Sequence, residues 1–193
     1  MGERIRIPVE VGEVSAHLAR PATSRAPAIV VLQEIFGVNA VMRDITDGLA
    51  AQGFLAVYPD LFWRIEPEID ITDRTEAEWK KAFALMNAFD ASQGVKDIAA
   101  TLDHIRAEPG CNGKAGAVGF CLGGQLAWLT ATRTDADAAV SYYGVGIEGL
   151  FSSTVLSLVL APVAYEQLAH GVRRLRILRG RAGSRTDPVT EAA

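Results

Sequence analysis

Cysteine and histidine are scarce in this sequence, which has two cysteines and three histidines among its 193 residues. Cys111 and Cys121 are too few to form a metal-ligand cluster or a disulfide framework. Because the chain also lacks an export signal, we expect both to be free thiols. Each thiol therefore has to be interpreted from its own surroundings.

The sequence also lacks a hydrophobic run long enough to cross a membrane. The longest apolar stretch, residues 150–164, is shorter than the roughly 18 residues of a spanning helix and carries four hydroxyl groups. The first residues, MGERIRIPVEV, have no apolar segment of the secretory type. We therefore expect a cytoplasmic protein that does not bind membranes.

An excess of charge of either sign is missing as well. The composition is 49% hydrophobic and 22% charged, with a formal net charge of −4. These values are typical of an ordinary globular protein, and the length suits one domain. We expect no nucleic acid partner for such a chain.

Apolar strands alternate with helical patterns along most of the chain. Residues 4–11 and 14–19 alternate β-branched with polar residues, as in an edge hairpin, whereas later continuous apolar runs bounded by turn signals are typical of strands buried on both faces. The predicted strands are 4–11, 14–19, 26–33, 54–59, 115–120 and 137–144, and the predicted helices are 41–53, 75–90, 92–107 and 122–132. This order predicts an α/β fold with a mostly parallel sheet flanked by helices. Ligands should then bind at the carboxyl ends of the strands, near residues 33–39, 59–64 and Cys121.

Cys121 lies in Gly119-Phe120-Cys121-Leu122-Gly123, which fits the nucleophile motif G-x-S-x-G with cysteine in place of serine. An apolar strand precedes the motif and a helical pattern follows, as the motif requires. The N-terminus of that helix is expected to lower the pKa of the thiol, and the Leu122 amide to face a developing oxyanion. The alternative is a packed cysteine that serves as a small hydrophobe.

Glu34 directly follows the first buried strand, in the segment QEIFGVN (33–39). A solvated loop carboxylate is the simpler interpretation of this residue alone. Together with YPDLFWR (58–64), GFCLGG (119–124) and SYYGVG (141–146), however, the segment resembles the dienelactone hydrolase family, the carboxymethylenebutenolidases of the α/β-hydrolase fold. The resemblance extends from about residue 4 to residue 149.

The resemblance implies a role for each of four residues. Cys121 is the implied nucleophile, Glu34 the carboxylate that contacts its thiol, and the amides of Ile35 and Leu122 form the implied oxyanion hole. The implied reaction is attack of the thiolate on a small ester or enol-lactone, followed by hydrolysis of the acyl-enzyme by water. This reaction needs no cofactor or metal.

A helix of the family presents aromatic and basic groups to an anionic substrate, and residues 76–90 are its nearest match here. This stretch offers Trp79, Lys80, Lys81 and Phe83. The alternative is a surface helix with an apolar stripe at Phe83, Met86 and Phe89. Trp63 and Arg64 could line the same site, or Trp63 could belong to the core.

The family's catalytic Asp and His have no recognisable match after Cys121. Only one histidine follows it, His170, in helical surroundings with Glu166 as its neighbour one turn away. His170 remains the candidate base, and His17 and His104 are weaker ones. The resemblance thus implies an α/β-hydrolase fold whose C-terminal strands are missing or altered.

The last part of the chain has a different character. Residues 171–186 contain six arginines and no acidic residue. We interpret 1–149 as an incomplete α/β-hydrolase core and 150–193 as a divergent Arg-rich tail, for example after a change of reading frame. Impaired hydrolysis is one consequence. A second is a non-catalytic pseudoenzyme or remnant that binds small carboxylates or a partner, and a third is a tail that binds nucleic acid or anions.

Overall fold

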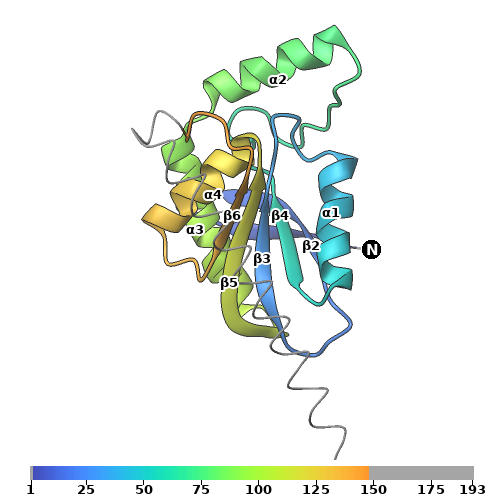
Figure 1. Cartoon of the computed structure of the whole chain (residues 1–193), viewed down its shortest axis with the longest axis vertical. Helices are drawn as coiled ribbons and strands as arrows, with labels where there is room; N and C mark the ends of the chain where they lie inside the picture. Colours follow the sequence, from blue (N-terminus) through green and yellow to red (C-terminus); the bar gives the residue numbers. More distant parts are fainter. Residues whose placement is uncertain (1, 148–193) are drawn as a thin grey trace, which may run out of the picture. The chain divides into compact units, whose positions relative to one another are not determined.

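A six-stranded sheet forms the centre of residues 2–147, the part of the chain that this computed structural model describes (Figure 1). The strand order is β1-β2-β4-β3-β5-β6. The strands are β1 (Glu3–Pro8), β2 (Glu13–Ala19), β3 (Ala26–Leu32), β4 (Leu55–Pro59), β5 (Cys111–Phe120) and β6 (Ala139–Tyr142). The helices are α1 (Ala40–Ala51), α2 (Glu76–Ala88), α3 (Ala91–Ala107) and α4 (Leu122–Arg133).

The sheet is parallel except at one edge. Strands β4, β3, β5 and β6 pair in parallel, whereas β1–β2 and β2–β4 are antiparallel pairs. Parallel neighbours need a crossover, and helices supply it between successive strands from β3 onwards. The carboxyl ends of β3, β5 and β6 consequently meet at the same end of the sheet.

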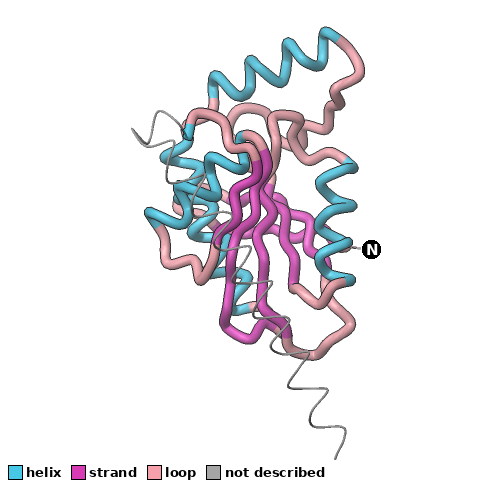
Figure 2. Tube along the Cα trace, in the orientation of Figure 1, coloured by secondary structure: helices cyan, strands magenta, loops and turns pink. Residues whose placement is uncertain are grey.

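Helices cover both faces of the sheet (Figures 1 and 2). Neighbouring residues of β3 point to opposite faces, as successive strand residues must. Val30 packs in the larger core with Leu102 of α3 and Leu126 of α4. Val31 packs in a second core with Met42 of α1. Residues 2–147 thus form a three-layer α/β/α arrangement, which is an α/β-hydrolase-like fold.

The predicted elements all occur, with shifted boundaries. The largest shift is at β5, which begins at Cys111 rather than at residue 115. Its first residues are exposed, so the apolar pattern used for the prediction could not include them. They join the sheet because Cys111 pairs with Ala26 of β3, before an irregularity in the register between Ala26 and Ala28.

Some predictions concern residues that the structure does not describe. Residues 148–193, which include the predicted Arg-rich tail and His170, lie outside the described residues. The boundary at residue 149 therefore stays a prediction.

Among residues 2–147, no helix combines the length and apolar character that crossing a membrane requires.

Candidate active site

Cys121 sits at a sharp bend between β5 and α4. Its backbone angles are φ 56° and ψ −115°, in the left-handed region that residues with side chains rarely adopt. Such strained angles cluster at functional sites, where the surrounding structure imposes them. The bend has the strand-turn-helix context of a nucleophile elbow.

Backbone hydrogen bonds hold this bend on both sides. The N–H of Cys121 donates to the carbonyl of Tyr142 over 3.1 Å, and the carbonyl of Cys121 accepts from the N–H of Val145 over 3.3 Å. The same carbonyl accepts from Gly124 and Gln125 in the first turn of α4, over 3.0 and 3.2 Å. The segment after β6 and the start of α4 together fix the conformation of Cys121.

The glycines beside Cys121 allow β3, β5 and α4 to approach closely. A Cβ atom on Gly119 would lie 1.8 Å from the carbonyl oxygen of Gly123. A Cβ atom on Gly123 would lie 2.3 Å from the carbonyl oxygen of Leu32 in β3. Neither position has room for a side chain, because the obstructing atoms belong to the backbone.

The surroundings of the Cys121 thiol favour its protonated form. Burial raises its pKa, the hydrogen bond from the Leu122 N–H lowers it, and the negative charge of Glu34 raises it further, with a net upward shift. The sequence-based prediction of a lowered pKa was therefore wrong. Desolvation disfavours the thiolate more than the single amide at the helix N-terminus stabilises it.

Glu34 lies at the carboxyl end of β3, half-buried, close enough to Cys121 for its charge to act on the thiol. Its carboxylate accepts a hydrogen bond of 3.2 Å from the Tyr143 hydroxyl. Within residues 2–147 no hydrogen bond joins the side chains of Glu34 and Cys121 directly. The structure thus brings the two predicted residues near each other, with Tyr143 bonded to Glu34.

The two amides predicted to form the oxyanion hole belong to the residues that follow Glu34 and Cys121. The N–H of Leu122 follows Cys121 directly and bonds toward its sulfur. Ile35 is buried, and among the described residues its N–H has no hydrogen-bond partner. An N–H without a protein partner is able to donate to an incoming oxygen, as the oxyanion-hole prediction requires.

A model of the dienelactone hydrolase family matches residues 14–162. The chain belongs to this family. A protein from Azospirillum brasilense is 50% identical over 148 residues, which are 72% of this chain and 60% of that protein. The carboxymethylenebutenolidase of Pseudomonas putida is 47% identical over 133 residues, 69% of this chain and 56% of that enzyme. The chain thus spans less than two thirds of the length of these relatives.

A solved structure supports the same fold. A crystal structure from Klebsiella pneumoniae subsp. pneumoniae superposes with a TM-score of 0.64 at 29% identity, covering 75% of this chain and 60% of that chain. The match extends over a large part of the chain. Fold and family are therefore consistent with each other.

Both histidines of the described part contact carboxylates of other residues, and neither is recorded in contact with Cys121. His17 of β2 pairs with Asp47 of α1 over 2.7 Å, and His104 pairs with Glu108 over 3.5 Å. His170 lies outside the described residues. Residues 2–147 contain no group of three or more His, Cys, Asp or Glu side chains that could hold a metal ion.

Helix α2 presents aromatic rings toward the loop after β3. Trp79 meets Phe36 edge-on, with ring centroids 5.1 Å apart, and lies 5.6 Å from Phe83. Trp79 and Phe83 remain 39% and 47% exposed. The predicted apolar stripe is thus only partly correct, because Phe83 is exposed while Ala82 and Leu85 are the buried residues of α2.

Three of the charged or aromatic residues that were considered for lining the site have structural partners. Lys81 pairs with Glu66 over 2.8 Å. The buried carboxylate of Asp97 accepts from the Trp63 indole over 2.9 Å and pairs with Arg64. The first contact ties α2 to the loop after β4, and the two contacts of Asp97 anchor that loop to α3.

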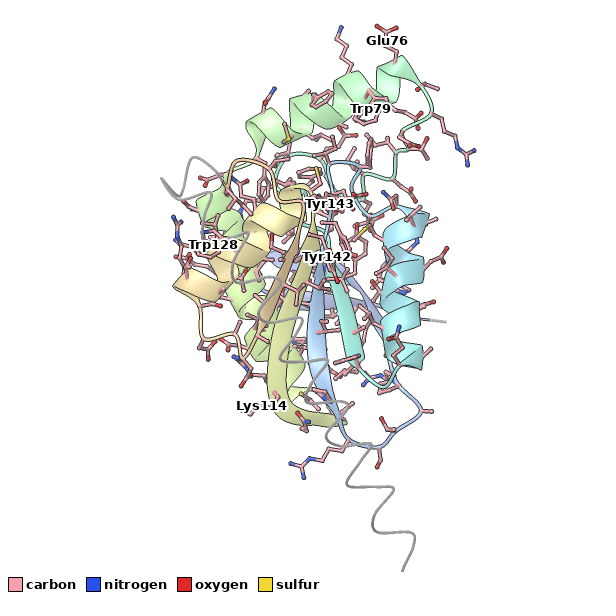
Figure 3. All side chains as sticks on the ribbon, in the orientation of Figure 1. Glu76, Trp79, Lys114, Trp128, Tyr142 and Tyr143 are labelled. Carbon is pink, nitrogen blue, oxygen red and sulfur yellow. The ribbon has the colours of Figure 1, made fainter. Side chains whose placement is uncertain are left out.

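Sequence reasoning assigned no role to two residues that the structure places at the site. Tyr143 belongs to the quoted SYYGVG segment, and Figure 3 shows it at the end of the sheet over which Trp79 and α2 lie. Gln33 is fully buried and accepts from the Leu61 N–H over 2.9 Å, while its Nε2 has no partner in the described structure. The predicted strand 137–144 included Tyr143, whereas β6 ends at Tyr142, so the sequence did not distinguish Tyr143 from a strand residue.

Replacing Gly123 by alanine tests the close packing of the elbow. We expect Gly123→Ala to lower the free energy of unfolding by about 1–3 kcal/mol, because the new methyl group would overlap the Leu32 carbonyl. Gly48→Ala is the matched control in α1, since a Cβ there meets nothing within 4 Å. Urea denaturation measures both variants, and equal stability of the two would contradict the packing argument.

Replacing Glu34 by glutamine tests the electrostatics of the thiol. Because the Glu34 charge raises the pKa of Cys121, we expect Glu34→Gln to lower that pKa and to move alkylation by iodoacetamide to lower pH. Mass spectrometry of the Cys121 peptide across a pH series gives the midpoint. The Cys111 peptide of the same samples is the internal control, and an unchanged Cys121 midpoint would refute the assignment.

Proposed function

We propose that this chain hydrolyses carboxylic ester or enol-lactone bonds with Cys121 as the nucleophile. The observation that carries the proposal is the left-handed bend of Cys121 between β5 and α4, beside the Glu34 carboxylate. The family supports this class of reaction, and the name carboxymethylenebutenolidase of several relatives favours an enol-lactone. A small ester or lactone is then the substrate.

The first half of the reaction uses groups within the described residues. The thiol proton of Cys121 passes to the Glu34 carboxylate, and the sulfur attacks the carbonyl carbon of the substrate. The oxygen of the tetrahedral intermediate takes up the negative charge and accepts from the N–H groups of Ile35 and Leu122. The leaving oxygen then takes the proton back from Glu34, and an acyl thioester on Cys121 remains.

The second half needs a base that activates water. His17 and His104 pair with carboxylates elsewhere, and His170 lies outside the described residues. Among the described residues this leaves Glu34, the carboxylate whose charge acts on Cys121. We propose that hydrolysis of the thioester is slower than its formation. Ester hydrolysis is then impaired at this second step.

A second candidate function is a pseudoenzyme that binds small carboxylates or a partner without turnover. The pairing of both described histidines away from Cys121, together with the raised pKa of its thiol, favours this alternative. The proposed cytoplasmic location and the expected lack of nucleic acid binding also stay predictions.

Hydrolysis of p-nitrophenyl acetate separates the two functions. We expect a burst of p-nitrophenolate followed by slower turnover, since acylation is proposed to be the faster step. Cys121→Ala should abolish the burst, and Glu34→Gln should lower its rate by about 100-fold.

Cys111→Ala is the matched control, because Cys111 lies at the opposite end of β5 from Cys121. It should leave the burst unchanged. Absence of any release above background by the unmodified chain would favour the pseudoenzyme.

A further inference from the structure

Tyr143 combines an exposed side chain with a specific contact at the site. It follows β6, is 68% exposed, and donates its hydroxyl proton to the Glu34 carboxylate over 3.2 Å. An exposed tyrosine does not need a carboxylate partner, because water satisfies its hydroxyl group. Folding of the core therefore does not explain why the Tyr143 hydroxyl pairs with Glu34.

The backbone around Tyr143 is tied directly to Cys121. The residue before Tyr143 accepts from the Cys121 N–H, and Val145, two residues after it, donates to the Cys121 carbonyl. Tyr143 lies between these two hydrogen bonds, so its position relative to the nucleophile is fixed by the main chain. The bend at Cys121 that holds the thiol therefore also fixes where the backbone of Tyr143 lies.

Tyr143 itself has φ 38°, in the left-handed region that non-glycine residues rarely adopt. Cys121 and Tyr143 are therefore two left-handed residues joined by hydrogen bonds at one end of the sheet. Strain of this kind persists where neighbouring structure imposes it, and it points to a role in the site. Phe120 packs beside the Tyr143 ring, with centroids 6.2 Å apart.

We propose that Tyr143 is a positioning residue that holds the Glu34 carboxylate beside the Cys121 thiol, an inference that rests on the proposed function. Glu34 and Cys121 share no hydrogen bond within the described residues, whereas the Tyr143 hydroxyl bonds the Glu34 carboxylate and the backbone on either side of Tyr143 is bonded to Cys121. Without this link the flexible Glu34 side chain is free to turn toward water. The carboxylate would then stand less often where it can take the thiol proton.

Electrostatics agree with this arrangement. Burial and then the charge of Glu34 raise the pKa of the Tyr143 hydroxyl, which therefore stays protonated and able to donate. The same carboxylate raises the pKa of the Cys121 thiol. The size of the shift that Glu34 causes in the pKa of Cys121 therefore reports how firmly the carboxylate is held.

The test is a double-mutant cycle on the alkylation midpoint of Cys121, measured by peptide mass spectrometry over a pH series. Glu34→Gln should lower the midpoint in the native background. In the Tyr143→Phe background the same substitution should move the midpoint by less than half as much, because the carboxylate is no longer held. Tyr143→Phe removes one oxygen atom from an exposed ring, so the fold should be retained.

Tyr142→Phe is the matched control. Tyr142 is 50% exposed, stacks on Phe120, and its hydroxyl has no hydrogen bond within residues 2–147. In that background the full effect of Glu34→Gln should persist. An equal shift in the Tyr143→Phe and native backgrounds would overturn the proposal, and so would the absence of any shift in the native chain.

The readout does not depend on ester hydrolysis. A chain that shows the predicted coupling but does not release p-nitrophenolate refutes the proposed function and leaves the positioning role standing. A chain that hydrolyses esters without the coupling refutes the role of Tyr143 alone.

Discussion

The left-handed backbone of Cys121 is the constraint on which the rest of the site depends. A residue with a side chain adopts these angles only when its neighbours impose them. Here the segment after β6 binds the N–H and the carbonyl of Cys121, and α4 begins at the next residue. The glycines at 119 and 123 let β3, β5 and α4 close around the bend. The packing of the sheet, the start of α4 and the position of the Cys121 thiol therefore all depend on this bend.

In this geometry the Cys121 thiol lies at the bend and its protonated form is favoured. Burial and the Glu34 charge both raise the pKa of Cys121, and the Leu122 amide offsets them only in part. A protonated thiol with a carboxylate nearby is suited to proton transfer at the moment of attack. The ends of β3, β5 and β6 each contribute one member of this group, namely Glu34, Cys121 and Tyr143.

Local sequence patterns predicted most of the fold, and they selected the two residues, Cys121 and Glu34, on which the proposed site is built. The apolar runs identified the strands, and the glycine spacing around Cys121 identified the bend before α4. The sign of the thiol pKa was mispredicted, because burial depends on how three elements pack rather than on a motif. The role of Tyr143 was not predicted, because it arises from the pairing of β5 with β6 and from a left-handed turn that sequence periodicity does not encode.

The most direct test of the account is whether an acyl group forms on Cys121. The protein is mixed with p-nitrophenyl acetate, quenched in acid within the burst, digested and analysed by mass spectrometry. The account predicts an acetyl group on the peptide that carries Cys121 and an unmodified Cys111 peptide. An unmodified Cys121 peptide, with p-nitrophenolate released all the same, would contradict it.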